Sequence, residues 1–154
     1  MYQSFENLDV KLFKKCLIFL DIDGTLVADN EDVPTADVIK KTKELAEQNE
    51  VWLCSNSLNH KRNVAVKKAT SLPMIKGYRK PNKKILTCVP KASLDLKMVV
   101  IGDKVLTDGF FAFRIKANFI KVKRKLGNDR FHIKLYNSVD DIAFKFFKLW
   151  GIFS

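Results

Sequence analysis

Short runs of consecutive apolar residues alternate along the chain with amphipathic segments. The first run, 16–21 (CLIFLD), is continuous and short, as in a strand that is buried on both faces of a sheet. Residues 35–49 have apolar positions at helical spacing, and Thr35 is a suitable N-cap after Pro34. A second apolar run, 51–54 (VWLC), follows. The first third of the chain therefore predicts a strand, a helix and a second strand.

The rest of the chain continues this alternation. Further strands are expected over 97–101, 118–122 and, more weakly, 132–135. Further helices are expected over 58–70, from Pro81 to about Val89, over 105–116 and over 139–150. Strands that alternate with helices favour parallel βαβ units, so we expect an α/β fold: a mostly parallel open sheet with helices on both faces. No repeat or Pro/Gly-rich break divides the chain, and residues 1–154 are expected to form a single domain.

Composition narrows the class of protein. The 154 residues are 47% hydrophobic and include 12 Phe, which is enough to build a core. No apolar run approaches the roughly 18 residues of a membrane-spanning helix, and the N-terminus lacks the pattern of a secretory signal. The three cysteines, Cys16, Cys54 and Cys88, are widely spaced, which predicts neither a disulfide framework nor a zinc site and favours a reducing cytoplasm.

Positive charge is in excess and unevenly distributed. The chain has 28 Lys and Arg against 17 Asp and Glu, a formal net charge of +11. The surplus lies in residues 51–134, whose acidic residues are Asp95, Asp103, Asp108 and Asp129. Such a surface attracts nucleic acid, anionic lipid headgroups or phosphorylated ligands. Lysines that merely solvate the surface explain the surplus equally well.

Polar residues follow directly where the first two predicted strands end. Asp21 and Asp23 end the first (DIDGTL), and two carboxylates at positions i and i+2 can share a metal ion or one substrate. Ser55 and Asn56 end the second. Their hydroxyl and amide groups can hold phosphoryl oxygens, or they can simply cap the following helix. The first pair indicates a chemical site more strongly than the second.

The strand over 97–101 is followed by a third polar group. Asp103 and Asp108 stand in the pattern GDKVLTD, which is also compatible with acids that cap a helix. Lys80 lies between the second and third groups and is distinguished from its basic neighbours only by the proline after it. Ligands of open parallel sheets bind outside the carboxyl ends of the strands, so these residues are expected to meet there.

Taken in order, DIDGTL, a strand ending in Ser-Asn, Lys-Pro and GDKVLTD resemble the four motifs of the haloacid dehalogenase-like (HAD) phosphohydrolase superfamily over about residues 15–125. The resemblance implies a Rossmann-like α/β domain that hydrolyses phosphomonoesters with Mg²⁺. It also implies that Asp21 is the nucleophile that forms an aspartyl-phosphate, and that Asp23 is the general acid and then the general base.

The same resemblance implies the contacts of the metal and of the phosphoryl group. The implied ligands of Mg²⁺ are the Asp21 carboxylate, the Asp23 main-chain carbonyl, Asp103 and, in support, Asp108. Ser55, with Asn56 beside it, would bind the transferring phosphoryl group. Lys80 would balance the negative charge of nucleophile and phosphate, which must be neutralised before a carboxylate can approach a dianion.

The intervals between these motifs leave no room for a cap domain. Asp23 to Ser55, and Ser55 to Lys80, each accommodate about one helix and its connections. Among capless members, GYRKPNKKIL and GDKVLTDGFFAFRIKANFIKV resemble most closely the YqeG-type, or phosphatidylglycerophosphate phosphatase, branch. The chain departs from that branch at Gly24, where Asn is common, and at Phe110, where Gly-rich residues are common.

Two segments bear on a membrane-surface substrate. Residues 121–130 (KVKRKLGNDR) are basic, and each Lys or Arg near an anionic bilayer contributes about 1 kcal/mol. Near the C-terminus one helical stripe holds Ile142, Phe146, Trp150 and Phe153; it suits an interfacial helix, but a helix that covers one face of the sheet is the interpretation we favour. We therefore expect a cytoplasmic protein, either free or peripheral on the inner face of the membrane.

Three functions remain open at this point. The first is a Mg²⁺-dependent phosphatase that acts on phosphatidylglycerophosphate at a membrane surface. The second keeps the chemistry but acts on a soluble nucleotide or sugar phosphate, or on a nucleic-acid end, although no nucleic-acid-binding motif is present. The third, a basic non-catalytic binding module, requires that catalytic residues be lost, and none is. The sequence leaves the oligomeric state undetermined.

Overall fold

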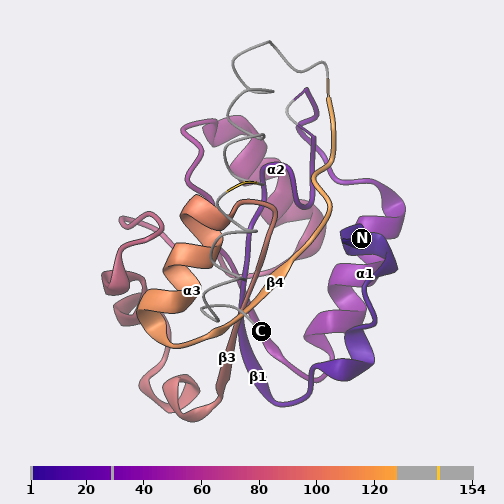
Figure 1. Ribbon diagram of the computed structural model, residues 1–154. Coiled ribbons are helices and arrows are strands. Elements are labelled where there is room, and N and C mark those ends of the chain that lie inside the picture. The colour runs from indigo at the N-terminus through magenta and orange to yellow at the C-terminus, as the bar shows by residue number, and fades with distance from the viewer. Residues whose placement is uncertain (1, 29, 128–141, 143–154) are drawn as a thin grey trace.

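In the part of the chain that the structure describes, four parallel strands form one sheet (Figure 1). They are β1 (Cys16–Leu20), β2 (Glu50–Leu53), β3 (Lys97–Gly102) and β4 (Asn118–Lys121), in the order β2-β1-β3-β4. This computed structural model describes residues 2–28, 30–127 and 142. The strand expected over 132–135 and, apart from Ile142, the helix expected over 139–150 lie outside the described residues. The prediction of an α/β fold with a parallel sheet is confirmed.

Strand β1 lies inside the sheet, with β2 hydrogen-bonded along one edge and β3 along the other. All five of its residues are buried, as expected for a strand covered on both faces. Because successive side chains point to opposite faces, they divide between two cores. Ile18 and Leu20 belong to the first core, and Leu17 and Phe19 to the second.

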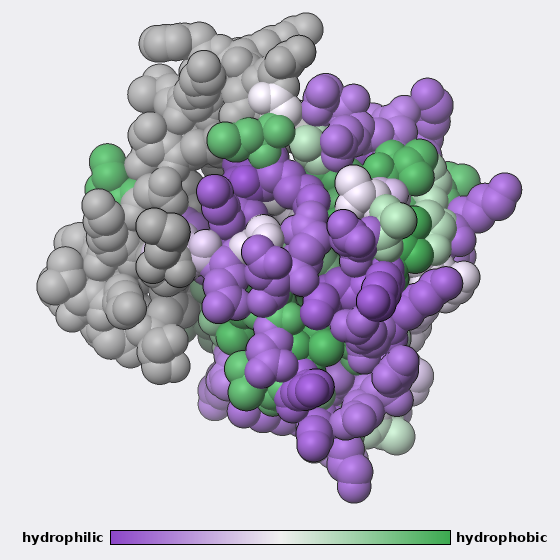
Figure 2. All heavy atoms as spheres, turned by 90° about the vertical axis from the view of Figure 1, so that its right-hand side faces the viewer, coloured by the Kyte–Doolittle hydropathy of each residue, from purple (hydrophilic) through white to green (hydrophobic). Residues whose placement is uncertain are grey.

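Helices α1 (Ala36–Ala46) and α2 (His60–Thr70) cover the first face of the sheet. Helix α1 contributes Val38 and Leu45 to the first core, and α2 contributes Val66. The remaining surface of α1 is polar, and the face of the molecule that carries it is mostly hydrophilic (Figure 2). Among the described residues, no helix is both long enough and apolar enough to cross a bilayer.

Helix α3 (Phe110–Ile115) covers the opposite face, so the helices lie on both sides of the sheet (Figure 1). Its Phe111 ring meets the ring of Phe19 edge-on, with centroids 5.4 Å apart. This helix is shorter than the one predicted over 105–116. Its first part, Val105–Gly109, is a π-helical turn.

The prediction of a helix from Pro81 to about Val89 is wrong. The chain forms a 3-10 segment, Lys83–Cys88, instead. Asn82 caps this segment by accepting a hydrogen bond from the backbone N–H of Lys84 at 3.0 Å. A segment of only six residues that includes β-branched and Cys side chains has little propensity for a full α-helix, so the tighter turn prevails.

Candidate active site

The carboxyl ends of the strands bring together residues that are far apart in the sequence. Asp21 directly follows β1, Ser55 lies two residues after the end of β2, and Asp103 directly follows β3. The chain passes from β1 to β2 on one side and later reaches β3 on the other side of β1. The crevice at such a switch point is where open α/β sheets bind ligands. Contacts described below connect the predicted residues Asp21, Asp23, Ser55, Asn56, Lys80, Asp103 and Asp108.

Three buried carboxylates form the centre of the site. Asp21, Asp103 and Asp108 each place one oxygen within 4.8 Å of the others. The buried ammonium of Lys80 lies 2.5 Å from Asp21 Oδ1 and 2.5 Å from Asp108 Oδ1. Arg124 Nη1 donates to Asp103 Oδ2 at 2.8 Å. Three carboxylates beside two cationic side chains leave an excess of negative charge.

One oxygen in this cluster has no hydrogen-bond partner among the described residues. Oδ1 of Asp103 is buried and accepts no hydrogen bond from any residue in the described part of the chain. A buried carboxylate oxygen left in this way costs free energy, on the order of 1–3 kcal/mol. The carboxylates of Asp21 and Asp108 lie beside it. A cation that prefers oxygen ligands would satisfy this atom and balance the excess charge.

Burial and mutual repulsion change the ionisation of the cluster. Burial, together with the charges of Asp21 and Asp108, raises the pKa of Asp103 well above its usual value. Burial and Asp21 also raise the pKa of Asp108, to about 6, although Lys80 acts in the opposite direction. For Lys80 itself, burial opposes the charge, but Asp108 and Asp21 outweigh it and raise the pKa above its usual value. The lysine is therefore charged at neutral pH.

Two glycines allow the backbone to approach these carboxylates. Gly24 has a φ of +85°, and a Cβ at this position would lie 2.5 Å from Asp103 Oδ2. At Gly102 a Cβ would lie 2.4 Å from the Asp108 carboxyl carbon. The π-helical turn after β3 then presents Asp108, whose Oδ2 accepts from the Lys104 backbone N–H at 3.1 Å. The backbone thus fits closely around the carboxylates.

Asp23 belongs to a separate ion pair. Its Oδ1 lies 2.5 Å from Nη1 of Arg62, and its Oδ2 accepts from the Ser55 hydroxyl at 2.9 Å. The hydroxyl of Ser55 in turn accepts from the Ser57 backbone N–H at 2.9 Å. The Asp23 carboxylate lies outside the cluster of three. The metal contact expected through the main-chain carbonyl of Asp23 stays a prediction. Phosphate binding by Ser55 also stays a prediction.

Asn56 holds the backbone of Lys80. Its amide group donates to the Lys80 carbonyl and accepts from the Lys80 N–H, both at 2.8 Å. This paired contact ties the end of β2 to the residue before Pro81, whose peptide bond is cis. Asn56 therefore positions the lysine that contacts the carboxylate cluster. The expected contact of Asn56 with a phosphoryl group stays a prediction.

Sequence reasoning missed three residues that contact the site. Thr25 is fully buried and donates to Asp21 Oδ2 at 3.1 Å. Arg62, on the first turn of α2, is a buried arginine that follows the Asn59 cap by three residues. Arg124 comes from the segment after β4. A short spacing from the strand-end motif could have indicated Thr25 and Arg62, but no local pattern indicates Arg124.

The basic segment expected over 121–130 is used partly within the protein. Arg124 pairs with Asp103, as described, and Lys125 pairs with Glu6. The ammonium of Lys121 lies 5.2 Å from the centre of the Tyr2 ring. Residues 128–130 lie outside the described residues. Binding of this segment to an anionic lipid surface stays a prediction.

A cavity of about 290 Å³ lies over the strand ends. Three cationic side chains, those of Arg62, Lys80 and Lys104, line it together with Asp21 and Asp23; the other lining residues are Asn56, Ser57 and Thr107. A phosphoryl group has room in this volume. Its negative charge would face cations on several sides.

Replacing Asp103 by Asn should stabilise the protein in the absence of divalent cations. An acid whose pKa is raised by folding destabilises the native state above its unfolded pKa. At pH 7.5 we expect the melting temperature to rise by about 2–4 °C, the effect of ~1 kcal/mol in a chain of this size. The gain should shrink towards pH 4, because the stability difference vanishes as the pH approaches the pKa of the unfolded carboxyl. Calorimetry in EDTA at the two pH values measures this, and a lower melting temperature at pH 7.5 would contradict it.

The comparisons with known proteins add no relative. No model of a known protein family matches the sequence, and no curated protein or solved structure is significantly similar to it. What the described residues do show is a parallel α/β sheet with buried carboxylates at its carboxyl edge. The functional argument therefore depends on the geometry of the chain itself.

Proposed function

We propose that the chain is a capless HAD-type phosphatase with a Rossmann-like sheet, which uses Mg²⁺ and hydrolyses phosphomonoesters through Asp21. The observation that carries the proposal is the cluster of Asp21, Asp103 and Asp108, bridged by Lys80 and adjoining a cavity lined by cations. Carboxylates that are buried together in this way repel one another. Buried carboxylates with perturbed pKa values are concentrated at functional sites.

The donor set suits Mg²⁺. Its three carboxylates supply only hard oxygen ligands, and Asp103 Oδ1 is left without a protein partner among the described residues. Asp21, Asp103 and Asp108 would hold the ion. When bound, Mg²⁺ would supply positive charge to offset the phosphoryl oxygens. Thr25, Arg124 and the Lys104 N–H would keep the ligands oriented through the hydrogen bonds described above.

In the first proposed step, a carboxylate oxygen of Asp21 attacks phosphorus. A bond from Asp21 to phosphorus forms while the bond from phosphorus to the leaving oxygen breaks. Asp23 gives a proton to that oxygen, which departs as an alcohol. Lys80 and Arg62 neutralise the approaching dianion, because both line the cavity. An aspartyl-phosphate remains on the enzyme.

In the second step, Asp23 takes a proton from water. The water oxygen bonds to phosphorus and the bond from Asp21 to phosphorus breaks, which releases inorganic phosphate and restores both carboxyl groups. Arg62 forms an ion pair with Asp23. A bound phosphoryl dianion competes for the same guanidinium, so it would free Asp23 to carry the proton. Ser55, bonded to Asp23 Oδ2, would keep the carboxyl aligned.

Phosphate release should require both Mg²⁺ and Asp103. With p-nitrophenyl phosphate as substrate, we expect turnover in Mg²⁺ and none in excess EDTA. Asp103→Asn should raise the Mg²⁺ concentration at half-maximal rate by about 10-fold or more, since it removes a ligand charge. Asp95→Asn, which removes an exposed carboxylate outside the site, is the matched control and should leave the titration unchanged. Turnover in EDTA, or equal titrations for Asp103→Asn and wild type, would contradict the proposal.

A further inference from the structure

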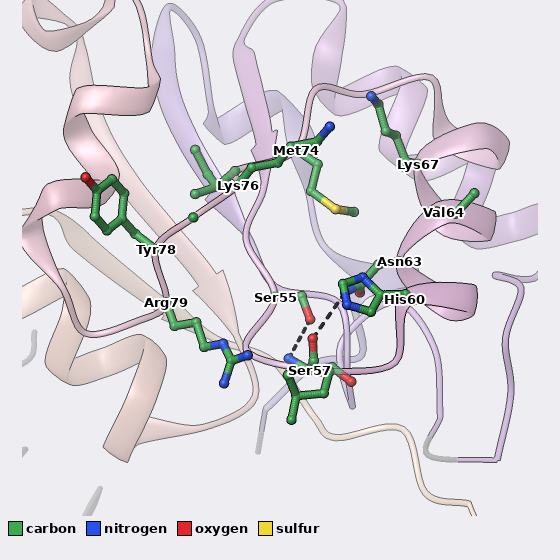
Figure 3. Close-up of a pocket in the computed structure, with 13 residues that line it drawn as sticks. Ser55, Ser57, His60, Asn63, Val64, Lys67, Met74, Lys76, Tyr78 and Arg79 are labelled. Atoms are coloured by element: carbon green, nitrogen blue, oxygen red, sulfur yellow. Dashed lines mark hydrogen bonds between the residues drawn. The ribbon is translucent and has the colours of Figure 1, made fainter.

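A second and larger cavity, of about 670 Å³, adjoins the first. Helix α2 forms one wall, with His60, Asn63, Val64 and Lys67, and the segment 74–79 forms the other (Figure 3). Ser57 lines both cavities. Ser55 lines the larger one and lies between its two walls. We call this cavity the basic groove, because Lys67, Lys76 and Arg79 line it and no Asp or Glu does.

The groove lies on the leaving-group side of the proposed reaction. Ser55 lines the groove, and its hydroxyl donates to Asp23, the proposed acid. The oxygen that leaves phosphorus must lie next to the acid that protonates it. In this proposal the rest of the leaving group extends from Asp23 past Ser55 and Ser57, because Ser57 lines both cavities and Ser55 lines the larger one. That path leads into the groove.

The charge of the groove is not balanced within the part of the chain that the structure describes. The side chains of Lys67, Lys76 and Arg79 are exposed and form no ion pair there. Their mutual repulsion would be relieved by an anion. The walls also offer apolar contacts from Val64, Met74 and Ile75. A ligand that fits this lining has an organic skeleton and a negatively charged group some distance from the phosphoryl group that is removed.

We propose that the basic groove binds a second phosphate group, carried on the leaving group of the substrate. The inference depends on the proposed function for its orientation. The substrate class is then a phosphomonoester that also carries a second phosphomonoester or phosphodiester. A soluble bisphosphate and a phospholipid headgroup share this chemistry. Lys76 and Arg79 would contact the second phosphate from one wall, and Lys67 from the other.

Binding can be measured without turnover in protein that carries Asp21→Asn. Titration calorimetry in Mg²⁺ would compare fructose 1,6-bisphosphate with fructose 6-phosphate, and phosphatidylglycerophosphate in mixed micelles with micelles that lack it. The groove variant is Lys76→Ala with Arg79→Ala. The matched control, Lys40→Ala with Lys43→Ala, removes two exposed cations from α1. A swap of Lys76→Arg with Arg79→Lys keeps the groove charge.

The bisphosphate or the lipid should bind at least about 10-fold more tightly than its partner ligand, and the groove variant should lose that preference. The α1 control and the charge-preserving swap should retain it. Preference for fructose 1,6-bisphosphate identifies a soluble substrate, and preference for the lipid identifies a headgroup; either supports the groove. No preference in either pair, or a preference that survives in the groove variant, overturns it. Failure to release phosphate from p-nitrophenyl phosphate would instead overturn the proposed function.

Discussion

Asp21→Asn is expected to reduce phosphate release by about 10⁴-fold or more, as loss of a catalytic nucleophile does in other hydrolases. The amide has the same size as the carboxylate but is not nucleophilic. Its oxygen can still accept from Lys80 or Thr25, so the buried side chain should remain in place. The variant also loses one of two negative charges next to Lys80. We expect the fold to be retained, as judged by circular dichroism.

Mass spectrometry of acid-quenched reactions tests the same residue directly. Wild-type protein should yield a phosphorylated peptide that contains Asp21, and the variant should not. Asp95→Asn serves again as the control, with full turnover and labelling. If the Asp21 variant kept more than a few per cent of the wild-type rate, the nucleophile would have to be sought elsewhere.

Lys80→Met should have the largest effect on stability. The substitution keeps the approximate length of the side chain but leaves Asp21 and Asp108 without the cation that lies 2.5 Å from each. Breaking a buried ion pair by removing one partner costs about 3–5 kcal/mol, because a buried charge is left uncompensated. The melting temperature should fall by roughly 10 °C. Phosphate release should also be lost.

Urea denaturation of Lys80→Met and of Lys84→Met, an exposed lysine nearby, measures this difference. The loss in Lys80→Met should shrink as the pH is lowered from 8 towards 5. Folding raises the pKa of Asp108 to about 6 even beside Lys80, which lowers it, so without the lysine the carboxyl takes up a proton within this range and one of the two uncompensated charges disappears. Mg²⁺ should restore part of the stability. Equal free energies of unfolding for the two variants would show that Lys80 does not neutralise the cluster.

The sequence predicted most of the framework because its signals are local. The continuous apolar run that became β1 is typical of a strand inside a parallel sheet covered on both faces, and Thr35 marks the start of α1 as expected. The prediction for the segment after Pro81 failed because helix propensity there is weak and a capped 3-10 turn competes with an α-helix. Local pattern decides the type of element best where the segment is long and strongly apolar.

The site was predicted less completely, for a physical reason. Strand ends are visible in the sequence, so the carboxylates could be placed together. Which residues pair with those carboxylates depends on the tertiary structure. Arg62 reaches Asp23 across the switch point, and Arg124 reaches Asp103 from the segment after β4. The local pattern around Arg124 does not differ from that of the other basic residues near it, and Arg62 is marked only by its short spacing from the end of β2.

The segment after β4 also has a consequence for how the protein is made. The backbone N–H of Lys123 donates to the Gln3 carbonyl and that of Lys125 to the Gly24 carbonyl, while Arg124 holds Asp103. The loop after β1 is therefore fastened by residues synthesised about a hundred positions later. During translation, Asp21 and Asp103 would both have left the ribosome before Arg124 is available to pair with Asp103. We expect the pair between Arg124 and Asp103 to be among the last contacts of the carboxylate cluster to form, because Arg124 follows β4, the last described strand in the chain.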